Sequence, residues 1–560
     1  MSDRPSPSSA FASALIGRLA ARGVEHVVVS PGSRSQALAL AAGHAALDGR
    51  LSVHIKIDER SAGFFALGLA RGTGKPVVVV TTSGTAVANL HPAMLEAWHS
   101  GDALIVVTAD RPAELRGRGA NQTTTQPGIF GPAATWQADV PAPTGAPDER
   151  RQAVGLADAA YSAAAVGRGH PSPVHLNIAF REPLSGGADA PLGEERIETF
   201  DAPRVTATVL TRGPLTIVVA GSGSGSEAER LAADGGWPLV AEVTSGARFG
   251  PNLVSAYRRV LDEETLAGRV ERAIVFGRPN LSRQVTALLT RSGVETVLVA
   301  QRGAEAFDPT GSAGRAQAVE VPGDPSSAEQ SWLREWIIAG RRLTEAGDDV
   351  AYIGGSGGGS AAERSRLVRA ELDAVRAPVT RRTLAEAVWR ATWPHDRLWF
   401  AASRLVREAD AVANGKKIPV YSSRGLAGID GTVSSALGLA AAAAADPRGA
   451  TGTTRVLLGD LAFLHDVGGL YIAPGEPRPR IQLIVGNDRG GSIFDGLEVA
   501  ATAHPDVFDR VMYTPHDVDL ASIAAAYGWA HTVVANRGDL DRALTAPPAG
   551  PSVLEVPLER

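Results

Sequence analysis

The feature that most constrains the fold is a repeated alternation of short apolar runs and helical stretches. Apolar runs of this kind are typical of parallel strands buried on both faces, and the helical stretches between them predict a doubly wound α/β sheet. Each run ends in a polar cluster, at the strand end where ligands bind in open α/β sheets. The expected strands cover residues 24–29, 51–57, 77–80, 104–107, 398–402, 420–423, 455–459 and 481–486.

The alternation recurs in three parts of the chain. At 560 residues the sequence is too long for one core, because a domain takes about 150 residues. We expect three α/β domains at residues 1–185, 204–345 and 376–560, with the first and third built on one plan. An acidic, Gly- and Pro-rich stretch at 186–203 and a Gly/Ser-rich stretch at 352–360 are typical of connecting segments.

Composition excludes several classes of protein. A net charge of −5 argues against nucleic-acid binding, which needs a basic face. The absence of cysteine excludes disulfides, thiolate nucleophiles and cysteine-bound zinc. Asp3 and Arg18 argue against a signal peptide, and the apolar run 436–445 is shorter than the roughly 20 residues that span a bilayer. We therefore expect a cytoplasmic, soluble protein without membrane insertion.

Two acidic strand ends predict a metal site. Gly459, Asp460 and Leu461 follow one apolar run, and Asn487 and Asp488 follow the next. Oxygen ligands from neighbouring strand ends suit Mg²⁺, which takes one or two carboxylates and leaves positions for substrate phosphates. The alternative interpretation is a pair of strand-end turns with solvated carboxylates.

A further pattern is close to a dinucleotide-binding fingerprint. The segment 221–225 reads Gly-Ser-Gly-Ser-Gly after an apolar run, and Glu242 lies 21 residues beyond its first glycine (242 − 221). The fingerprint needs glycine where this chain has Ser226, because the following helix packs closely on its strand there. We therefore expect a middle α/β domain that does not bind NAD or FAD.

Several motifs of the outer domains, taken in order, resemble one family. They occupy residues 30–35, 58–64, 82–89, 119–122, 423–431, 459–461 and 490–494. They are similar to those of the thiamine-diphosphate enzymes, and among these to the 2-succinyl-5-enolpyruvyl-6-hydroxy-3-cyclohexene-1-carboxylate synthases of menaquinone biosynthesis. The usual diphosphate–magnesium motif, Gly-Asp-Gly and then Asn-Asn, departs here at Leu461 and Asp488. The middle domain matches only weakly.

The resemblance implies a transferase that uses thiamine diphosphate and Mg²⁺, or Mn²⁺ in its place. Such an enzyme decarboxylates 2-oxoglutarate and adds the resulting carbanion equivalent of succinic semialdehyde to isochorismate in a conjugate addition. The first domain of one subunit would bind the pyrimidine and the third domain of another the diphosphate, so that the site straddles the interface of a homodimer. This homodimer would be the minimal active unit, and a homotetramer the assembly.

Two other functions stay open at this point. One is another thiamine-diphosphate 2-oxo acid decarboxylase or carboligase, such as an enzyme similar to acetohydroxyacid synthase. The other is an inactive binding protein that keeps the fold, and the retention of Glu59 together with Asp460 speaks against it.

Glu59 is the expected activator of the cofactor. In the family a carboxyl group hydrogen-bonds N1′ of the aminopyrimidine and promotes its imino tautomer. Glu59 follows the run 51–57, next to a helix start that favours negative charge, while Asp58 is the better candidate for the helix cap. Ile429 would wedge the cofactor into its bent shape, or else be an ordinary core residue. The other implied cofactor contacts are Pro31, Asn89, Gly459, Asp460, Leu461, Ala462 and Ile493.

The second metal ligand beside Asp460 has two candidates. Counting back from the Gly490-Gly491 pair selects Asp488, with the Gly490 carbonyl as a further ligand. Counting forward from Asp460 by the family's usual separation selects Asn487. We favour Asp488, whose extra negative charge Arg489 could offset.

Both implied substrates are dianions, so their sites need arginine and other polar donors. The resemblance assigns Ser403, Arg407 and Arg424 to the distal carboxylate of 2-oxoglutarate. With Glu59 and Gln122, these three form the expected catalytic set. The isochorismate side is expected to use Ser33, Arg34, Arg111, Gln122 and Arg283, with Ile493, Phe494 and Leu497 as pocket walls.

Overall fold

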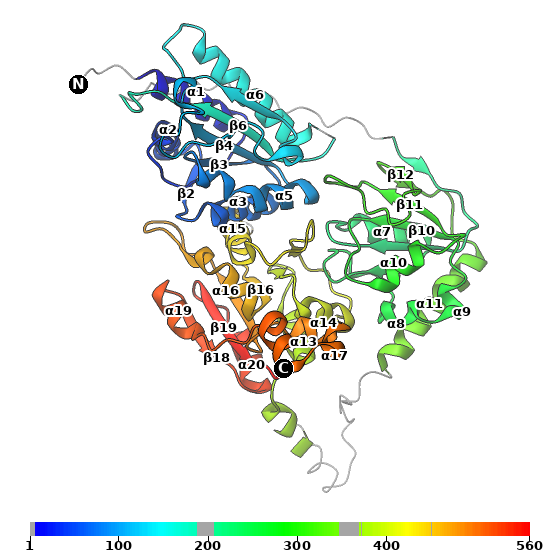
Figure 1. The fold of residues 1–560 in the computed structure, drawn as a ribbon. Helices are drawn as coiled ribbons and strands as arrows, with labels where there is room; N and C mark the ends of the chain where they lie inside the picture. Colours follow the sequence, from blue (N-terminus) through cyan, green and yellow to red (C-terminus); the bar gives the residue numbers. More distant parts are fainter. Residues whose placement is uncertain are drawn as a thin grey trace.

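The computed structural model describes residues 6–186, 206–345 and 369–560, apart from 168, 371, 448 and 450. The expected connecting segments lie outside these residues, except for Gly186. The chain forms three α/β units, each around its own parallel sheet (Figure 1). No helix in the described ranges is long and apolar enough to cross a lipid bilayer.

The first unit is a six-stranded sheet in the order β2-β1-β3-β4-β6-β5, with every pairing parallel. Alternate residues of β3 enter two different cores, since Val79 packs with α3 and α5 while Val78 and Val80 pack with α1, α2 and α6. The expected doubly wound plan is thereby confirmed. The elements are α1 (Pro7–Ala21), β1 (His26–Val29), α2 (Gln36–Leu47), β2 (Ser52–Ile55), α3 (Glu59–Thr73), β3 (Val77–Thr81), α4 (Thr85–Ala88), α5 (His91–Ser100), β4 (Leu104–Asp110), β5 (Gln137–Val140), α6 (Glu149–Val166) and β6 (Val174–Ala179).

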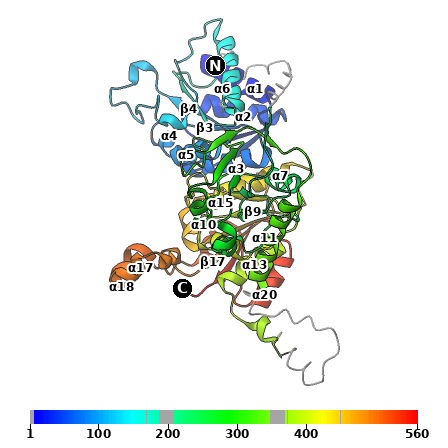
Figure 2. The ribbon, with the colours of Figure 1, turned by 90° about the vertical axis from the view of Figure 1, so that its right-hand side faces the viewer.

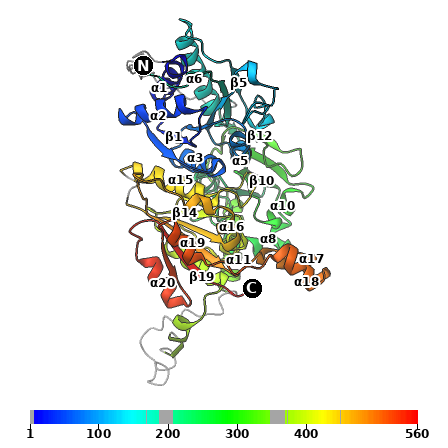
Figure 3. The same cartoon turned by 60° about the vertical axis from the view of Figure 1, so that its left-hand side comes forward.

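The third unit repeats this plan in the order β15-β14-β16-β17-β19-β18. Val456 and Leu458 of β16 face α15, whereas Leu457 faces α13, α14 and α20. The segment that carries α17 and α18 projects from the body of this unit (Figures 2 and 3). The elements are α13 (Arg381–Ala391), β14 (Arg397–Phe400), α14 (Arg404–Val412), β15 (Val420–Ser422), α15 (Thr432–Ala445), β16 (Thr454–Gly459), α16 (Asp460–His465), β17 (Ile481–Asn487), η4 (Ser492–Gly496), α17 (Val499–Thr502), α18 (Pro505–Phe508), α19 (Leu520–Ala526), β18 (Ala530–Val533), α20 (Arg537–Thr545) and β19 (Ser552–Pro557).

The middle unit has a five-stranded parallel sheet in the order β12-β11-β10-β8-β9. Trp332 and Trp336 of the long helix α11 lie fully buried against it, with their rings edge to face. The elements are β7 (Thr208–Val209), β8 (Thr216–Ala220), α7 (Glu227–Gly235), β9 (Leu239–Ala241), α8 (Tyr257–Leu261), α9 (Glu264–Ala267), β10 (Arg272–Phe276), α10 (Arg283–Leu289), β11 (Glu295–Val299), β12 (Gly314–Ala316), β13 (Val319–Glu320) and α11 (Ser327–Glu345).

One expected boundary near Glu59 differs from the structure. The strand expected at 51–57 is shorter, because Ile57 is 69% exposed and lies outside the sheet. Helix α3 begins at Glu59 itself, with Asp58 as its N-cap. Each sheet lies within one of the three expected domains, whose limits at 185, 204, 345 and 376 stay predictions.

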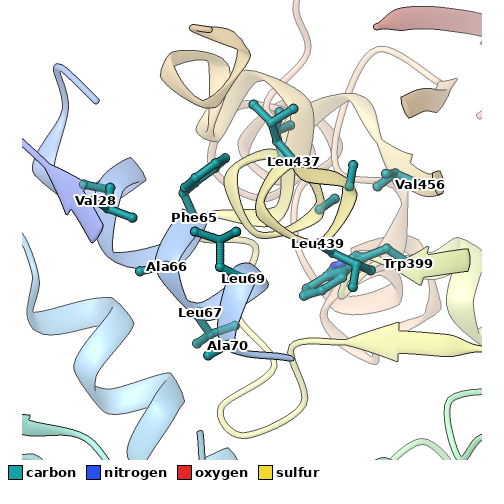
Figure 4. Close-up of a cluster of buried hydrophobic side chains, with 14 of the residues drawn as sticks. Val28, Phe65, Ala66, Leu67, Leu69, Ala70, Trp399, Leu437, Leu439 and Val456 are labelled. Carbon is teal, nitrogen blue, oxygen red and sulfur yellow. The ribbon is translucent and has the colours of Figure 1, made fainter. Parts of the chain in front are cut away.

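The first and third units meet where α3 crosses α15 (Figure 4). The crossing is close because glycines line it: a Cβ added to Gly68 would lie 1.9 Å from the Ser435 carbonyl oxygen, and one added to Gly438 would lie 2.1 Å from the Phe65 carbonyl oxygen. Leu69, Leu437 and Leu439 fill the surrounding core. Because α3 starts at Glu59 and α15 starts three residues after Ile429, this contact sets the relative position of two predicted cofactor residues.

Candidate active site

The expected metal ligands meet at one edge of the third sheet. β16 and β17 are neighbours in register, with Gly459 opposite Gly486, so both strands end at the same edge. Asp460 begins α16 immediately after β16, and Asn487 ends β17. Leu461 and Ala462 follow in the first turn of α16, so the predicted diphosphate contacts lie on the same edge.

Asp460 is a buried carboxylate held by backbone donors. One oxygen accepts from the Leu461 N–H at 2.7 Å, and the other from the Gly490 N–H at 2.9 Å, with His516 Nε2 3.1 Å away. Burial and then the neighbouring Asp488 charge raise the pKa of the Asp460 carboxyl. A divalent cation between the two carboxylates would remove this repulsion, so the residues fit the expected ion.

The two candidates for the second ligand are in different environments. Both polar atoms of the Asn487 amide are used, since Nδ2 donates to Glu555 at 2.7 Å and Oδ1 accepts from the Arg489 N–H at 3.1 Å. Asp488 accepts from Arg381 at 2.6 Å and from the Ser492 hydroxyl, both through Oδ2. Its Oδ1 has no hydrogen bond in the described residues, which favours Asp488 as the ligand.

The charge that offsets Asp488 was predicted wrongly. Arg489 adopts a left-handed backbone (φ 60°), and its side chain reaches Asp517 at 3.3 Å on an exposed surface. Arg381, at the start of α13, pairs with Asp488 instead. The Gly490 carbonyl accepts no hydrogen bond from the described residues, as a third ligand would require. No group of three His, Cys, Asp or Glu side chains in the described ranges is arranged to hold a metal ion.

Glu59 stands at the first position of α3 with an unengaged carboxylate. Asp58 takes the capping role, accepting from the Arg60 and Ser61 N–H groups at 2.8 and 3.4 Å, as expected. The half-buried Glu59 carboxylate makes no hydrogen bond or ion pair with the described residues. Arg60 donates to the His465 carbonyl at 2.7 Å, at the end of the helix that Asp460 begins. The Glu59 carboxylate is therefore available to a ligand.

The arginines expected to bind 2-oxoglutarate lie in the third unit, where the middle unit packs on it. Arg424 is only 5% exposed, and its Nε and Nη2 donate to Asn280 Oδ1 at 2.9 and 2.6 Å. Arg407 is exposed and donates to the Ser403 carbonyl at 3.1 Å. Burial is the largest effect on the pKa of Arg424 and lowers it. Glu242 raises this pKa, and the charge of Arg407 lowers it further. Ser403 also caps α14 through its hydroxyl, which accepts from the Leu405 N–H at 3.2 Å.

Two of the residues expected to bind isochorismate, Arg111 and Gln122, contact Ser83, which the sequence interpretation did not single out. Its hydroxyl accepts from Arg111 at 3.1 Å and donates to the Gln122 carbonyl at 2.8 Å, while the Gln122 side chain donates to the Ser83 carbonyl at 3.1 Å. The buried Nε of Arg34 has no partner in the described residues. Burial and then the Arg111 charge lower the pKa of Arg34, while Glu182 raises it, and neither arginine forms an ion pair within the described residues. The polar segment 81–85 at the end of β3 was the available signal for Ser83.

The remaining predicted contacts lie at the surface of the single chain. Arg283 begins α10 on the middle unit, where it is exposed and makes no hydrogen bond or ion pair with the described residues. The structure does not bring it to Arg34 and Arg111. Ile429 is half-buried against the α3–α15 core. Exposed positions hold Pro31, Ser33, Asn89 and Leu497, and half-buried ones hold Ile493 and Phe494.

The Gly-rich loop of the middle unit lines a cavity of about 770 Å³ between the three units. Glu242, the acid of the fingerprint-like pattern, is fully buried. Its Oε1 accepts from the Leu281 and Ser282 N–H groups at 2.7 and 3.3 Å. This role is structural and opposes a dinucleotide site.

Comparisons with known proteins agree with this geometry. Residues 10–129 match the family model described as the thiamine pyrophosphate enzyme, N-terminal TPP binding domain. A 2-succinyl-5-enolpyruvyl-6-hydroxy-3-cyclohexene-1-carboxylate synthase of Leifsonia xyli is 52% identical over 99% of this chain and 97% of its own length, and one of Clavibacter michiganensis is 48% identical over the same shares. The fold also matches a crystal structure of benzoylformate decarboxylase from Polynucleobacter necessarius, with a TM-score of 0.65, 16% identity and 98% of each chain covered.

Proposed function

This chain belongs to the family of 2-succinyl-5-enolpyruvyl-6-hydroxy-3-cyclohexene-1-carboxylate synthases, thiamine-diphosphate-dependent transferases of menaquinone biosynthesis, and from that premise we propose how its residues act. Its substrates are 2-oxoglutarate and isochorismate. The enzyme releases CO₂ from the first and joins the remaining four-carbon unit to the ring of the second.

One observation carries the choice of substrates. Arg34, Arg111, Arg407 and Arg424 all follow strand ends, yet none of them forms an ion pair within the described ranges. Arg111 and Arg424 are also buried, and burying an unpaired cation is costly, so these two are expected where a ligand supplies the missing charge. Two groups of unpaired arginines suit two dianionic substrates, whereas pyruvate carries a single carboxylate.

The cofactor is thiamine diphosphate, held with Mg²⁺ or Mn²⁺. When bound, its thiazolium supplies the electron sink for decarboxylation and carbon–carbon bond formation. Asp460, Asp488 and the Gly490 carbonyl would hold the cation against the diphosphate. Glu59 would hold a proton between its carboxyl oxygen and N1′ of the aminopyrimidine, and its lack of other partners supports that role.

Substrate orientation falls to the arginines. Arg407 and Arg424 would clamp the distal carboxylate of 2-oxoglutarate, which aims its keto carbon at the cofactor. Arg34 and Arg111 would hold the carboxylates of isochorismate, with Gln122 and Ser83 fixing Arg111. Binding both dianions in this way aligns the reacting carbon atoms, and such alignment can lower the activation free energy by several kcal/mol.

A homodimer in the cytoplasm is the minimal active unit that we propose, within a homotetramer. Large apolar side chains near the predicted site are exposed in the single chain, and a second copy of the chain would bury them. They are Ile57, Leu426 and Leu497, which are 69%, 52% and 49% exposed.

A panel of 2-oxo acids tests the function. With thiamine diphosphate and Mg²⁺, purified protein should release CO₂ from 2-oxoglutarate and form a new carbon–carbon product only when isochorismate is added. Pyruvate and 2-oxobutyrate should react poorly. Preferred use of pyruvate, with condensation onto a second 2-oxo acid, would instead support the acetohydroxyacid-synthase-like alternative.

A further inference from the structure

The middle unit holds one of the predicted substrate arginines directly. Asn280 lies just after β10, and its Oδ1 accepts from both Nε and Nη2 of Arg424, at 2.9 and 2.6 Å. The same Nη2 lies 3.1 Å from the Asn280 carbonyl, and Asn280 Nδ2 donates to the Arg424 carbonyl at 3.2 Å. Four contacts between two residues on different units fix both the backbone and the guanidinium plane of Arg424.

The geometry leaves one side of Arg424 available. Asn280 occupies the Nε and Nη2 side, whereas Nη1 makes no hydrogen bond with the described residues. An asparagine orients a guanidinium without cancelling its charge, as an aspartate would. Arg424 is therefore oriented, still cationic and able to donate to an anion through Nη1.

The loop that carries Asn280 is itself anchored. Glu242 Oε1 binds the backbone N–H groups of Leu281 and Ser282, immediately after Asn280. On the same side of the middle unit, Asp410 of α14 accepts from the Val243 N–H at 2.8 Å and from the Tyr257 hydroxyl at 2.6 Å. Arg407 lies one turn before Asp410 in α14. The middle unit therefore binds both α14, which carries Arg407, and the segment after β15, which carries Arg424.

We propose that Asn280 is a positioning residue that orients Arg424 for the distal carboxylate of a dicarboxylic 2-oxo acid, so that the middle unit sets substrate selectivity. This inference rests on the proposed function, in which Arg424 binds that carboxylate. A purely structural role for Asn280 would give an interface bond whose loss lowers stability without changing the preference among 2-oxo acids.

Three variants separate these roles. Asn280→Ala removes the support of Arg424. Asn280→Asp keeps an acceptor for Nε and Nη2 but adds a negative charge beside the anion site. Asn252→Ala is the matched control, because the Asn252 amide binds the Ala232 and Trp237 carbonyls at 2.7 and 3.0 Å within the middle unit and does not contact Arg424.

Two readouts are needed. The first is kcat/KM for 2-oxoglutarate and for 2-oxobutyrate, which lacks the distal carboxylate. The second is the affinity for glutarate, a non-reacting dicarboxylate, measured by calorimetry on enzyme loaded with thiamine diphosphate and Mg²⁺. Misplacing a binding group by about 1 Å can cost 10²-fold, so we expect Asn280→Ala to lose about 10–100-fold on 2-oxoglutarate and on glutarate and little on 2-oxobutyrate.

The variants have distinct expected outcomes. Asn280→Asp loses the Nδ2 donor to the Arg424 carbonyl, so it should not unfold above the wild-type temperature, and it should bind glutarate as weakly as Asn280→Ala does. Asn252→Ala should lower the unfolding temperature and leave the preference between the 2-oxo acids unchanged. Equal losses on both 2-oxo acids in Asn280→Ala, restored glutarate binding in Asn280→Asp, or a changed preference in Asn252→Ala would each overturn the inference.

Failure of the proposed function gives a different result. If wild-type enzyme does not release CO₂ from 2-oxoglutarate, the proposed function is wrong, and the glutarate affinities still test whether Asn280 prepares Arg424 for a dicarboxylate. If the wild type prefers 2-oxoglutarate and Asn280→Ala keeps that preference, only the role of Asn280 is wrong.

Discussion

Replacing Gly68 by alanine should disturb both the stability of the chain and the position of Glu59, the proposed activator of the cofactor. The new Cβ would lie 1.9 Å from the Ser435 carbonyl oxygen, 2.7 Å from its carbon and 3.0 Å from the Leu439 nitrogen. All three are backbone atoms of α15, so no side chain can rotate away. Since carbon atoms pack best at about 3.5–4.0 Å, α3 and α15 must separate by more than 1 Å at this point.

The expected cost follows from that displacement. Overpacking costs typically about 1–3 kcal/mol, against which alanine in a helix regains about 0.5–1 kcal/mol. At about 2–4 °C per kcal/mol for a unit of this size, the unfolding temperature should fall by a few degrees. Because α3 begins at Glu59, a shift of about 1 Å should also lower turnover, by up to about 10²-fold.

Gly155→Ala is the matched control. Gly155 lies inside α6, and a Cβ there would meet nothing within 4 Å, so this change should raise stability slightly and leave turnover alone. Both variants are measured by thermal unfolding, by thiamine diphosphate affinity and by CO₂ release. If Gly68→Ala behaves like Gly155→Ala in all three measurements, the α3–α15 crossing does not position Glu59 and the reasoning is wrong.

Three further changes test separate parts of the site. Glu59→Gln should retain the fold and much of the cofactor affinity but cut turnover by roughly 10²–10⁴, and near-normal turnover would remove Glu59 from the mechanism. Chelation should abolish activity reversibly, and metal affinity measured by calorimetry should fall more in Asp488→Ala than in Asn487→Ala; the opposite order would show that Asn487 is the ligand. Burial and then Asp410 raise the pKa of Glu242 from its usual 4.5 to about 8, so this group's contribution to stability is fully present below about pH 4.5 and is lost as pH rises through about 8. Glu242→Gln should therefore flatten the decline in unfolding temperature between pH 5 and 9, and an unchanged decline would place its origin elsewhere.

What could be predicted from the sequence was what depends on neighbouring residues along the chain. Apolar strands with polar ends were sufficient to place Asp460 and Asp488 at one sheet edge, and Asp58 was recognisable as a cap from its place before the helix. Asn280 and Arg381 carry no such local signal. They reach Arg424 and Asp488 only through the packing of elements about 144 and 107 residues away along the chain.

The prediction that Arg489 offsets the charge of Asp488 was wrong for a related reason. Proximity in sequence suggested that it would neutralise Asp488, but its left-handed backbone turns the side chain to solvent. Ser83 could be predicted in part. The polar end of β3 is visible in the sequence, but the contacts of Ser83 with Arg111 and Gln122 depend on the packing of segments that are distant along the chain.

The first and third sheets share one strand order, β2-β1-β3-β4-β6-β5 matching β15-β14-β16-β17-β19-β18 when thirteen is subtracted from each number of the second. Under this correspondence Ser83, just beyond β3, stands near the place that Asp460 occupies beyond β16, and Arg111 after β4 stands near that of Asp488 after β17. A duplicated ancestral unit would leave this record, with the two copies diverging at the same edge, one toward anionic substrates and the other toward a cation. The ligand-binding positions of the first unit can then be located from those of the third unit, and the reverse also holds.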